Sequence, residues 1–366
     1  MKMSIPSHQS LDLLAQKTLS VSKEKTNIIL SVAIPTRNRK PLLCELIESI
    51  LPQLSCSIQI VISDNASDDD TNNYCTSLLS GHHGQNFKFI QNAINIGMEK
   101  NLLRAVSECD GEYVWLMGDD DKIKPGAFED ILYILSMRDY ATGLVNYEEF
   151  DYYFSCKLRE YRFNITQDNL NATIEDMLKA AAFFFSFLSC HIVRKSLWMS
   201  TDLSRFEGQP TDSVQIYVPI IAGAQGSNFI LARPILSKRN SRYNLEDIYT
   251  INIAQGWFES MEKAVEVGVS RNVVDNFYKE FINHLHLSRD ILHKKINRYD
   301  AQLEKDWVIL MRQYGRFSGY WLFVVPLFLV PRPLLCIILA AYRTMKRMLK
   351  WLPKNCSNLF FIRRCT

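Results

Sequence analysis

The feature that most constrains the fold is a regular alternation of short apolar segments and amphipathic segments between residues 27 and 147. Apolar runs rich in branched side chains, with the length of buried strands, predict strands at residues 28–34, 58–63, 87–91, 113–117 and 143–147. Segments with helical spacing lie between them, at residues 41–54, 70–79, 98–106 and 126–137. Strand–helix alternation with short connections predicts an α/β fold in which helices flank a mostly parallel sheet.

Polar clusters follow four of these strands, at residues 35–39, 64–70, 92–101 and 118–121. In a parallel α/β sheet, ligands bind in the crevice beyond the carboxyl ends of the strands. We therefore expect the four clusters to meet at one edge of the sheet, although they are far apart in the sequence. The pattern predicts one ligand site there.

The last of these clusters, Gly118-Asp119-Asp120-Asp121, places three successive carboxylates directly after an apolar run. Carboxylates this close repel one another, so a folded protein keeps them together mainly where a cation neutralises them. Mg²⁺ and Mn²⁺ prefer such oxygen ligands, and either ion can bridge a diphosphate and stabilise it as a leaving group. The alternative is a solvated acidic turn that caps the helix beginning near Pro125.

The other clusters contain groups suited to a nucleotide. Asp64 can accept hydrogen bonds from a base N–H or a ribose hydroxyl, whereas a helix cap is the alternative role for this cluster. Gly97, in Asn95-Ile96-Gly97, permits a positive φ angle or the close approach of a ligand. Asn101, one turn into the next helix, is expected to face the same edge.

Together these residues resemble the family-2 glycosyltransferases of the GT-A fold, from residue 28 to about residue 147. The resemblance rests on Ile34-Pro35-Thr36-Arg37-Asn38-Arg39, Ser63-Asp64-Asn65-Ala66-Ser67, Asn95-Ile96-Gly97 and an acidic triplet in the place of the family's D-x-D motif. It implies a Rossmann-like GT-A sheet and transfer of a sugar from a nucleotide diphosphosugar, with Mn²⁺ or Mg²⁺ at the acidic motif.

The resemblance also implies roles for individual residues. By position, the nucleotide-sugar site comprises Pro35, Thr36, Arg39, Asp64, Asn95, Gly97 and Asp119, and the metal ligands are Asp120 and Asp121. Many family members have an aspartate at the position of Gly118, which leaves open the role of each neighbouring aspartate. Inverting members use a carboxylate from the second half as the base. Asp212 is the candidate for this base, and Glu207 is the alternative. A helix N-cap is an equally good interpretation of Asp212.

The second half is less regular. Its pattern predicts helices at residues 174–187, 195–199, 212–221, 248–267, 271–297 and 300–314, and strands at residues 188–194 and 228–236. His191 lies in an apolar run and is expected in the core or at its rim. We divide the chain into a polar extension (1–26), a catalytic domain (27–245, with a donor half to residue 147 and an acceptor half from 148), a helical region (246–315) and an amphipathic tail (316–366).

The tail combines apolar and basic segments. Residues 320–330 and 334–342 are apolar, and Pro331 and Pro333 separate them. Neither segment reaches the roughly 20 residues that span a bilayer. With Trp321, Trp351 and the basic residues that follow, they indicate interfacial attachment to an anionic membrane. A pair of core helices is the alternative. In a glycosyltransferase, such a tail fits a polyprenyl-linked acceptor and a peripheral position on the cytoplasmic face of a bacterial plasma membrane, as in O-antigen assembly.

Composition and missing motifs exclude other classes. A net charge of +3 is too small to indicate nucleic acid as the partner, and nine cysteines without metal-binding spacing indicate free thiols in a reducing cytoplasm. The sequence has no G-x-x-x-x-G-K and no G-x-G-x-x-G motif. Two alternatives remain: a sugar-nucleotide pyrophosphorylase, which needs a glycine-rich loop that residues 35–39 lack, and a non-catalytic Mg²⁺-binding adaptor, which leaves the second half unexplained.

Overall fold

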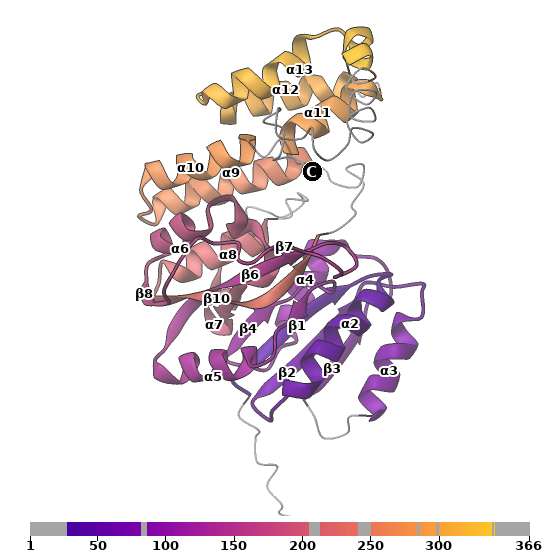
Figure 1. Cartoon of the computed structure of the whole chain (residues 1–366), viewed down its shortest axis with the longest axis vertical. Helices are drawn as coiled ribbons and strands as arrows, with labels where there is room; N and C mark the ends of the chain where they lie inside the picture. The colour runs from indigo at the N-terminus through magenta and orange to yellow at the C-terminus, as the bar shows by residue number, and fades with distance from the viewer. Residues whose placement is uncertain are drawn as a thin grey trace, which may run out of the picture.

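Four parallel strands form the first part of the central sheet, in the order β3-β2-β1-β4 (Figure 1). The structure is a computed structural model that describes residues 28–81, 86–204, 213–240, 250–283, 286–297, 300–338 and 340. The elements of this part are β1 (Leu30–Thr36), α2 (Lys40–Ile50), β2 (Ile58–Asp64), α3 (Thr71–Gly81), β3 (Phe87–Gln91), α4 (Met98–Ser107), β4 (Tyr113–Leu116) and α5 (Ala127–Met137). Each one was predicted from the sequence, with small differences at the ends.

Beyond β4 the sheet is mixed. The order continues β9-β6-β10-β5, with β9 (His191–Arg194) antiparallel to both β4 and β6 (Tyr140–Phe150). β10 (Ser227–Arg239) pairs parallel with β6, and three short strands that sequence patterns did not predict pair at the margins: β5 (Lys122–Ile123), β7 (Lys157–Arg159) and β8 (Asn169–Ala172). The predicted α/β class with a Rossmann-like sheet is confirmed, with the parallel order confined to β3-β2-β1-β4 and to the β6–β10 pair.

Some elements of the second half differ from the periodicity. The helix predicted at residues 174–187 ends as α6 (Ile174–Ala181), because Ala182 adopts a φ angle of +45° and a 3₁₀ segment follows. The strand predicted from residue 188 begins with a 3₁₀ turn, Leu188–Cys190, before β9. α7 (Lys195–Ser200) and α8 (Val214–Gly223) complete this part. Side-chain periodicity alone does not report such changes in backbone conformation.

A group of helices follows β10 and packs against the α6 side of the sheet (Figure 1). It comprises α9 (Thr250–Glu266), α10 (Arg271–Asn283), α11 (His286–Ile296), α12 (Asp300–Tyr314) and α13 (Val325–Leu329). α10 and α11 lie within the helix predicted at residues 271–297, and residues 284–285 between them lie outside the described residues. Phe183, from the aromatic run after α6, contacts Trp257 of α9 and Phe281 of α10 at ring-centroid distances of 5.4 and 6.0 Å. The predicted helical C-terminal region is therefore present, and an aromatic cluster joins it to the sheet.

The core fills both faces of the sheet. Trp115 of β4 is fully buried and meets Phe128 of α5 edge-on at 5.9 Å. His191 is also fully buried, as predicted, and its Nε2 lies 2.6 Å from the carbonyl oxygen of Phe185. Burial lowers the pKa of His191 to about 4, so the ring is neutral at physiological pH.

No single helix in the described ranges is long and apolar enough to cross a membrane. One bent pair passes that test together: Tyr320–Leu329, which begins as a π-helix, and Arg332–Ile338, with 116° between the two parts. The bend falls at Pro331 and Pro333, where a break was predicted. The basic residues from Arg343 onward lie outside the described residues.

Replacing Gly143 tests the fit between β6 and β10. A Cβ at this position would lie 2.0 Å from Cζ of the Phe229 ring, which leaves no room for a methyl group. Overpacking of this kind costs about 1–3 kcal/mol. We expect Gly143→Ala to lower the free energy of unfolding in urea by that amount. Gly81→Ala is the control, because a Cβ there meets nothing within 4 Å. Equal stability of the two variants would contradict the packing described for this strand pair.

Candidate active site

The four polar clusters lie together at the carboxyl edge of the parallel strands, as predicted. After β1, the Asn38 N–H donates to Ser67 Oγ at 2.8 Å, and after β2, the Asp68 N–H donates to Asn38 Oδ1 at 2.8 Å. Arg39 contacts the acidic cluster after β4, and Asn65 contacts the loop after β3. The sheet thus assembles one site from four separate parts of the sequence.

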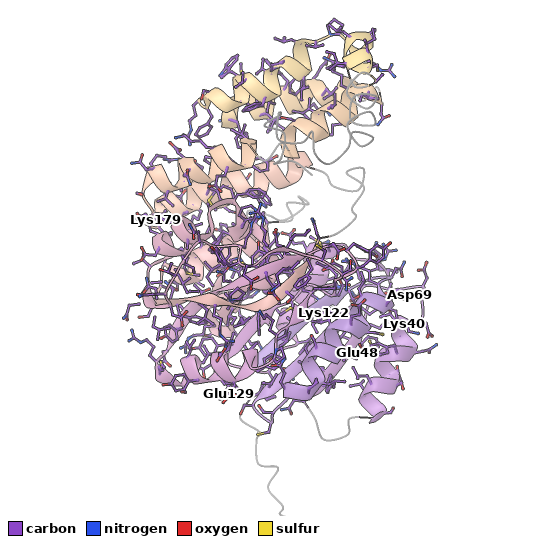
Figure 2. The ribbon with its side chains drawn as sticks, viewed as in Figure 1. Lys40, Glu48, Asp69, Lys122, Glu129 and Lys179 are labelled. Carbon is purple, nitrogen blue, oxygen red and sulfur yellow. The ribbon has the colours of Figure 1, made fainter. Side chains whose placement is uncertain are left out.

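Further contacts join the loops after β1 and β2. The Lys40 N–H donates to Asp69 Oδ2 at 3.1 Å, and Lys40 Nζ lies 2.5 Å from Asp70 Oδ2. Figure 2 shows Lys40 and Asp69 at this edge, on the side nearer the helical region, and Glu129 near the opposite edge. The two loops therefore form one continuous wall of the site.

Arg39 is the cation that faces the acidic cluster. Its Nη1 lies 2.8 Å from Asp119 Oδ1, and its Nη2 lies 2.5 Å from Asp120 Oδ2. Thr36 Oγ1 donates to the other Asp119 oxygen at 2.7 Å. Burial raises the pKa of Asp119 to about 7, and the Arg39 guanidinium opposes that rise. The fixed fork of a guanidinium suits two carboxylates side by side, and it limits their mutual repulsion.

Asp64 is fully buried at the end of β2. It accepts hydrogen bonds from the Ser67 hydroxyl and from the Ser67 N–H at 3.2 Å, and Gln91 Nε2 lies 3.3 Å from its Oδ2. The tight turn that returns Ser67 to Asp64 passes through Ala66, whose φ angle is +57°. Asp64 is thus a fixed hydrogen-bond acceptor on the same edge as Arg39.

Asn65 organises the loop after β3. Its Nδ2 donates to Asn95 Oδ1 at 2.7 Å and to the Gly97 carbonyl at 3.2 Å, and its Oδ1 accepts from the Ile96 N–H at 2.9 Å. Gly97 has a φ angle of +88°, in the left-handed region that glycine permits. Asn95 and Gly97 therefore shape a loop at this edge, where their predicted role was nucleotide-sugar binding.

Asn101 of α4 faces the same edge, as predicted. Its side chain is buried and hydrogen-bonded within the protein. Its Oδ1 accepts from Ser63 Oγ and from Asn92 Nδ2, each at 2.8 Å. Arg104 Nη1 donates to Asn92 Oδ1 at 2.6 Å. The chain of amides ties β2, the loop after β3 and α4 to one another, which fixes the floor below the site.

Asp121 turns away from Asp119 and Asp120 into the protein. It is almost fully buried, and its Oδ2 accepts from Ser189 Oγ at 2.6 Å while its Oδ1 accepts from the Arg239 N–H at 3.2 Å. The Gly118 N–H donates to the same Ser189 hydroxyl at 2.9 Å. Burial and the neighbouring Asp120 carboxylate raise the pKa of Asp121 to about 8. Asp121 therefore anchors the acidic turn to the second half of the sheet.

Gly118 leaves the space that this anchor occupies. A Cβ at Gly118 would lie 3.1 Å from Asp121 Oδ2 and 3.4 Å from Ser189 Oγ, tighter than or at the limit of ordinary contact. An aspartate at this position would crowd the Asp121 carboxylate. The departure from the family pattern at Gly118 thus accompanies a hydrogen-bonded Asp121.

Arg239, at the end of β10, braces the same turn. Its Nε donates to the Asp120 carbonyl at 3.0 Å, and its Nη2 lies 2.8 Å from Glu45 Oε2 on α2. The guanidinium carbon lies 4.4 Å from the centroid of the Phe154 ring. Because Arg239 is buried, these contacts hold the backbone of the acidic turn between the two halves.

Asp120 is the residue in the acidic cluster best placed to hold a metal ion. Each carboxylate oxygen of Asp119 and of Asp121 has a hydrogen-bond or ion-pair partner. Asp120 Oδ2 contacts Arg39, but Asp120 Oδ1 has no such partner among the described residues. No group of three metal-ligating side chains occurs in the described ranges. The site fits Mg²⁺ or Mn²⁺ held by one carboxylate, with the remaining ligands from a diphosphate and water. It does not favour the prediction that Asp121 is a second ligand.

Two predicted residues cannot be placed. Asp212, the candidate base, and Glu207, its alternative, both lie outside the described residues. Pro35 is described, within β1 and opposite Ser63 of β2 in the strand register. Its position beside Thr36 puts it on the edge where the other predicted nucleotide-site residues lie.

Sequence reasoning missed Ser189 and Arg239. Arg239 follows an apolar strand at its carboxyl end, so the rule that identified the other clusters could have identified it. Ser189 carried no signal, because its hydroxyl reaches Asp121 only through the 3₁₀ turn before β9. The fold and this edge define the class of protein: an α/β protein with a GT-A-like fold and a candidate nucleotide site.

Comparison with known proteins relates one segment of the chain to a known family. The sequence model of glycosyl transferase family 2 matches residues 31–197, a segment that holds Thr36, Arg39, Asp64 and the whole acidic cluster. This segment of the chain is therefore similar to glycosyl transferase family 2. The chain is 29% identical over 189 residues to the abequosyltransferase RfbV of Salmonella typhimurium, an alignment that covers 48% of this chain and 55% of that protein.

A second relative is the Campylobacter jejuni enzyme named GalNAc(5)-diNAcBac-PP-undecaprenol beta-1,3-glucosyltransferase, 31% identical over 103 residues. That alignment covers 28% of this chain and 33% of the relative. The chain thus spans between a third and just over half of the length of these two relatives.

Solved structures share the fold. The crystal structure of S. aureus TarS 1-349 in complex with UDP-GlcNAc matches with a TM-score of 0.59 and 15% sequence identity. The match covers 79% of this chain and 82% of that one. At this identity the likeness supports the fold alone. It covers more of the chain than the family match does.

Ser189→Ala tests the anchor of the acidic turn. The change removes a hydroxyl that serves the buried Asp121 carboxylate and the Gly118 N–H together. A buried polar group left without its partner costs about 1–3 kcal/mol. We expect that loss in the free energy of unfolding, measured with urea, and weaker nucleotide binding. Ser186→Ala is the control, because among the described residues its half-buried hydroxyl donates to the Phe183 carbonyl and to no buried carboxylate. Wild-type stability in Ser189→Ala would refute the anchor.

Proposed function

We propose that this chain is a glycosyltransferase that moves a sugar from a nucleotide diphosphosugar to a lipid-linked glycan acceptor. The observation that carries the proposal is the meeting of Asp64, Arg39 and the Asp119–Asp120 pair at one edge, within the segment matched by glycosyl transferase family 2. A fixed, buried carboxylate such as Asp64 suits a base N–H or a ribose hydroxyl. A guanidinium beside a carboxylate suits a diphosphate and its metal ion.

The proposed reaction is a metal-dependent displacement. Mn²⁺ or Mg²⁺ held at Asp120 would neutralise charge that develops on the diphosphate as it leaves. Arg39 lies within reach of the same charge because it contacts Asp120 in the structure. The metal ion and the Arg39 guanidinium would therefore both place positive charge beside the leaving diphosphate.

On the opposite side, an acceptor hydroxyl must lose its proton to a base within about 2.6–3.2 Å. Attack from that side inverts the anomeric carbon. We propose Asp212 as the base, with Glu207 as the alternative, from their places in the sequence and from the resemblance to inverting family members. The mechanism predicts a product whose anomeric configuration is opposite to that of the donor.

The lipid-linked acceptor is supported by the relatives and by the surface of the chain. One relative carries PP-undecaprenol in its name, and another is an abequosyltransferase. On the bent helical pair, the exposed residues include Trp321, Leu322, Leu329 and Ile337. Exposed apolar side chains gathered on one segment are typical of an interaction surface. We propose a peripheral position on the inner face of a bacterial plasma membrane, in the assembly of a surface polysaccharide such as an O-antigen.

A donor panel with an Asp120→Ala variant tests the reaction. UDP-, GDP-, CDP- and dTDP-sugars are compared for thermal shift and for hydrolysis with Mn²⁺, Mg²⁺ or a chelator. One nucleotide class should stabilise the protein, and the metal should accelerate turnover. Because a metal ion supplies several kcal/mol of charge stabilisation, Asp120→Ala should lower kcat at least about 100-fold.

Asp139→Ala is the matched control, since Asp139 is exposed and its ion pair with Arg194 at 3.2 Å is at the surface. It should retain full activity. If no donor bound, the proposed function would be wrong. If Asp120→Ala kept its metal-dependent turnover, the proposed function would stand, but the assignment of Asp120 as the metal ligand would be wrong.

Asp212→Asn tests the base separately. General-base catalysis contributes about 10²–10⁴-fold, so kcat for transfer should fall by that factor while donor binding stays unchanged. Glu207→Gln is measured beside it, and product configuration is read by NMR. A fall confined to Glu207→Gln would exchange the two roles, and retention of configuration would exclude the proposed inverting mechanism.

A further inference from the structure

A cavity of about 690 Å³ lies beside the bent helical pair. Lys279 and Ile282 of α10 form one wall, and Arg316 and Phe317, which follow α12, form another. Leu322 and Phe323 of the π-helical turn also line the cavity, together with Ser318 and Gly319. The volume is within the range of small-ligand sites, roughly 300–1,000 Å³. We refer to this cavity as the tail pocket.

The polar part of the tail pocket carries two cations. Lys279 is exposed, and the structure gives its amine no ion pair or hydrogen bond to any described residue. Arg316 lies over the rings of Tyr278 and Phe317, with its guanidinium carbon 5.6 and 4.9 Å from their centroids. Its Nη2 lies 2.8 Å from Asp275 Oδ1, and 46% of the side chain stays accessible.

The surrounding charge favours an anion. Glu262 lies 3.8 Å from Arg316 Nη2 and also 2.6 Å from Arg271 Nη1. Counting the cations Lys279, Arg316 and Arg271 against Asp275 and Glu262 leaves one net positive charge. The accessible cations are therefore not fully compensated by the acidic residues around them.

The other part of the tail pocket is apolar and opens onto an exposed surface. Leu322 is 66% exposed and Phe323 is 40% exposed. The bent pair extends this surface to Leu329 and Ile337, which are 72% and 65% exposed. Cations at one end of a cavity and an apolar surface at the other match a molecule with an anionic head and a hydrocarbon chain.

The sequence of this end of the chain fits the same partner. Residues 307–366 contain no aspartate or glutamate, and they contain ten cations: Arg312, Arg316, Arg332, Arg343, Lys346, Arg347, Lys350, Lys354, Arg363 and Arg364. An anionic membrane surface attracts such a segment by about 1 kcal/mol for each cation near it. Because the segment has no acidic residues, it carries no negative side chain that an anionic membrane would repel.

We propose that the tail pocket binds the phosphate group of a membrane lipid, with Lys279 and Arg316 on the phosphate and with Leu322 and Phe323 along the start of the lipid chain. This inference rests on the proposed function, because it gives the lipid-linked acceptor and its membrane a place on the chain. It assigns a ligand site outside the nucleotide edge. The phosphate belongs either to a bulk anionic phospholipid or to a polyprenyl diphosphate.

Vesicle flotation of the full chain tests the phosphate contact. Vesicles of phosphatidylcholine are compared with vesicles that also contain phosphatidylglycerol, or a polyprenyl diphosphate at equal total charge. Lys279→Gln should weaken partition to the anionic vesicles about fivefold, the equivalent of 1 kcal/mol. Lys305→Gln is the matched control, because Lys305 is an exposed lysine of α12 outside the pocket. It should change partition less than twofold.

The two lipid sources give different results. Stronger binding to the polyprenyl diphosphate vesicles that depends on Lys279 would assign the pocket to the acceptor. Equal Lys279-dependent binding to both anionic vesicles would assign it to bulk phospholipid. Equal losses in Lys279→Gln and Lys305→Gln, or no vesicle binding by the wild type, would overturn the proposal.

A second pair of variants tests the apolar part. Leu322 and Val308 are each 66% exposed, but only Leu322 lines the pocket. Leu322→Ser should lower partition at least tenfold, since burying a leucine side chain contributes about 1.5–3 kcal/mol. Val308→Ser should not. Equal effects would show that the exposed apolar surface acts without a site.

Nucleotide-sugar thermal shift on the same samples separates this inference from the proposed function. Lys279→Gln should keep the wild-type shift. A chain that binds a nucleotide sugar but no vesicle refutes the tail pocket alone. A chain that binds vesicles through Lys279 but no nucleotide sugar refutes the proposed function alone.

Discussion

The ion pairs of Arg39 with Asp119 and Asp120 are the interaction on which the site depends. Three adjacent carboxylates cannot stay close without positive charge or hydrogen-bond donors. The fold supplies a guanidinium for two of them and buries the third beside a hydroxyl and a backbone N–H. These contacts fix the acidic turn, and Asp120 Oδ1 has no such partner among the described residues. Preorganised charge of this kind is what stabilisation of a leaving group requires.

Most of the first half could be predicted because its information is local. Apolar runs such as residues 58–63 and 87–91 became strands, and the rule for parallel sheets correctly placed Thr36, Asp64 and Asp119 at one edge. The second half could not be predicted as well, because its departures are changes of backbone conformation. The turn at Ala182 and the antiparallel entry of β9 leave no trace in the spacing of apolar residues.

The same distinction applies to the site. Residues on the motif-bearing loops were identified from their positions after strands. The orientation of each carboxylate was not, since Asp119, Asp120 and Asp121 are chemically identical in the sequence. Only the three-dimensional partners distinguish them. Asp119 contacts Arg39 and Thr36, and Asp121 contacts Ser189. Asp120 contacts Arg39 through Oδ2, while its Oδ1 has no partner among the described residues.

The attachment of the acidic turn to Ser189 and Arg239 has a consequence for how the chain can be divided. A fragment that ended at residue 147 would carry every recognisable motif and would still lack both groups that hold that turn in place. The geometry of the acidic turn therefore depends on both halves of the sheet. Recombining such a fragment with the second half of a related protein would need a hydroxyl and an arginine at these two positions to reproduce the turn.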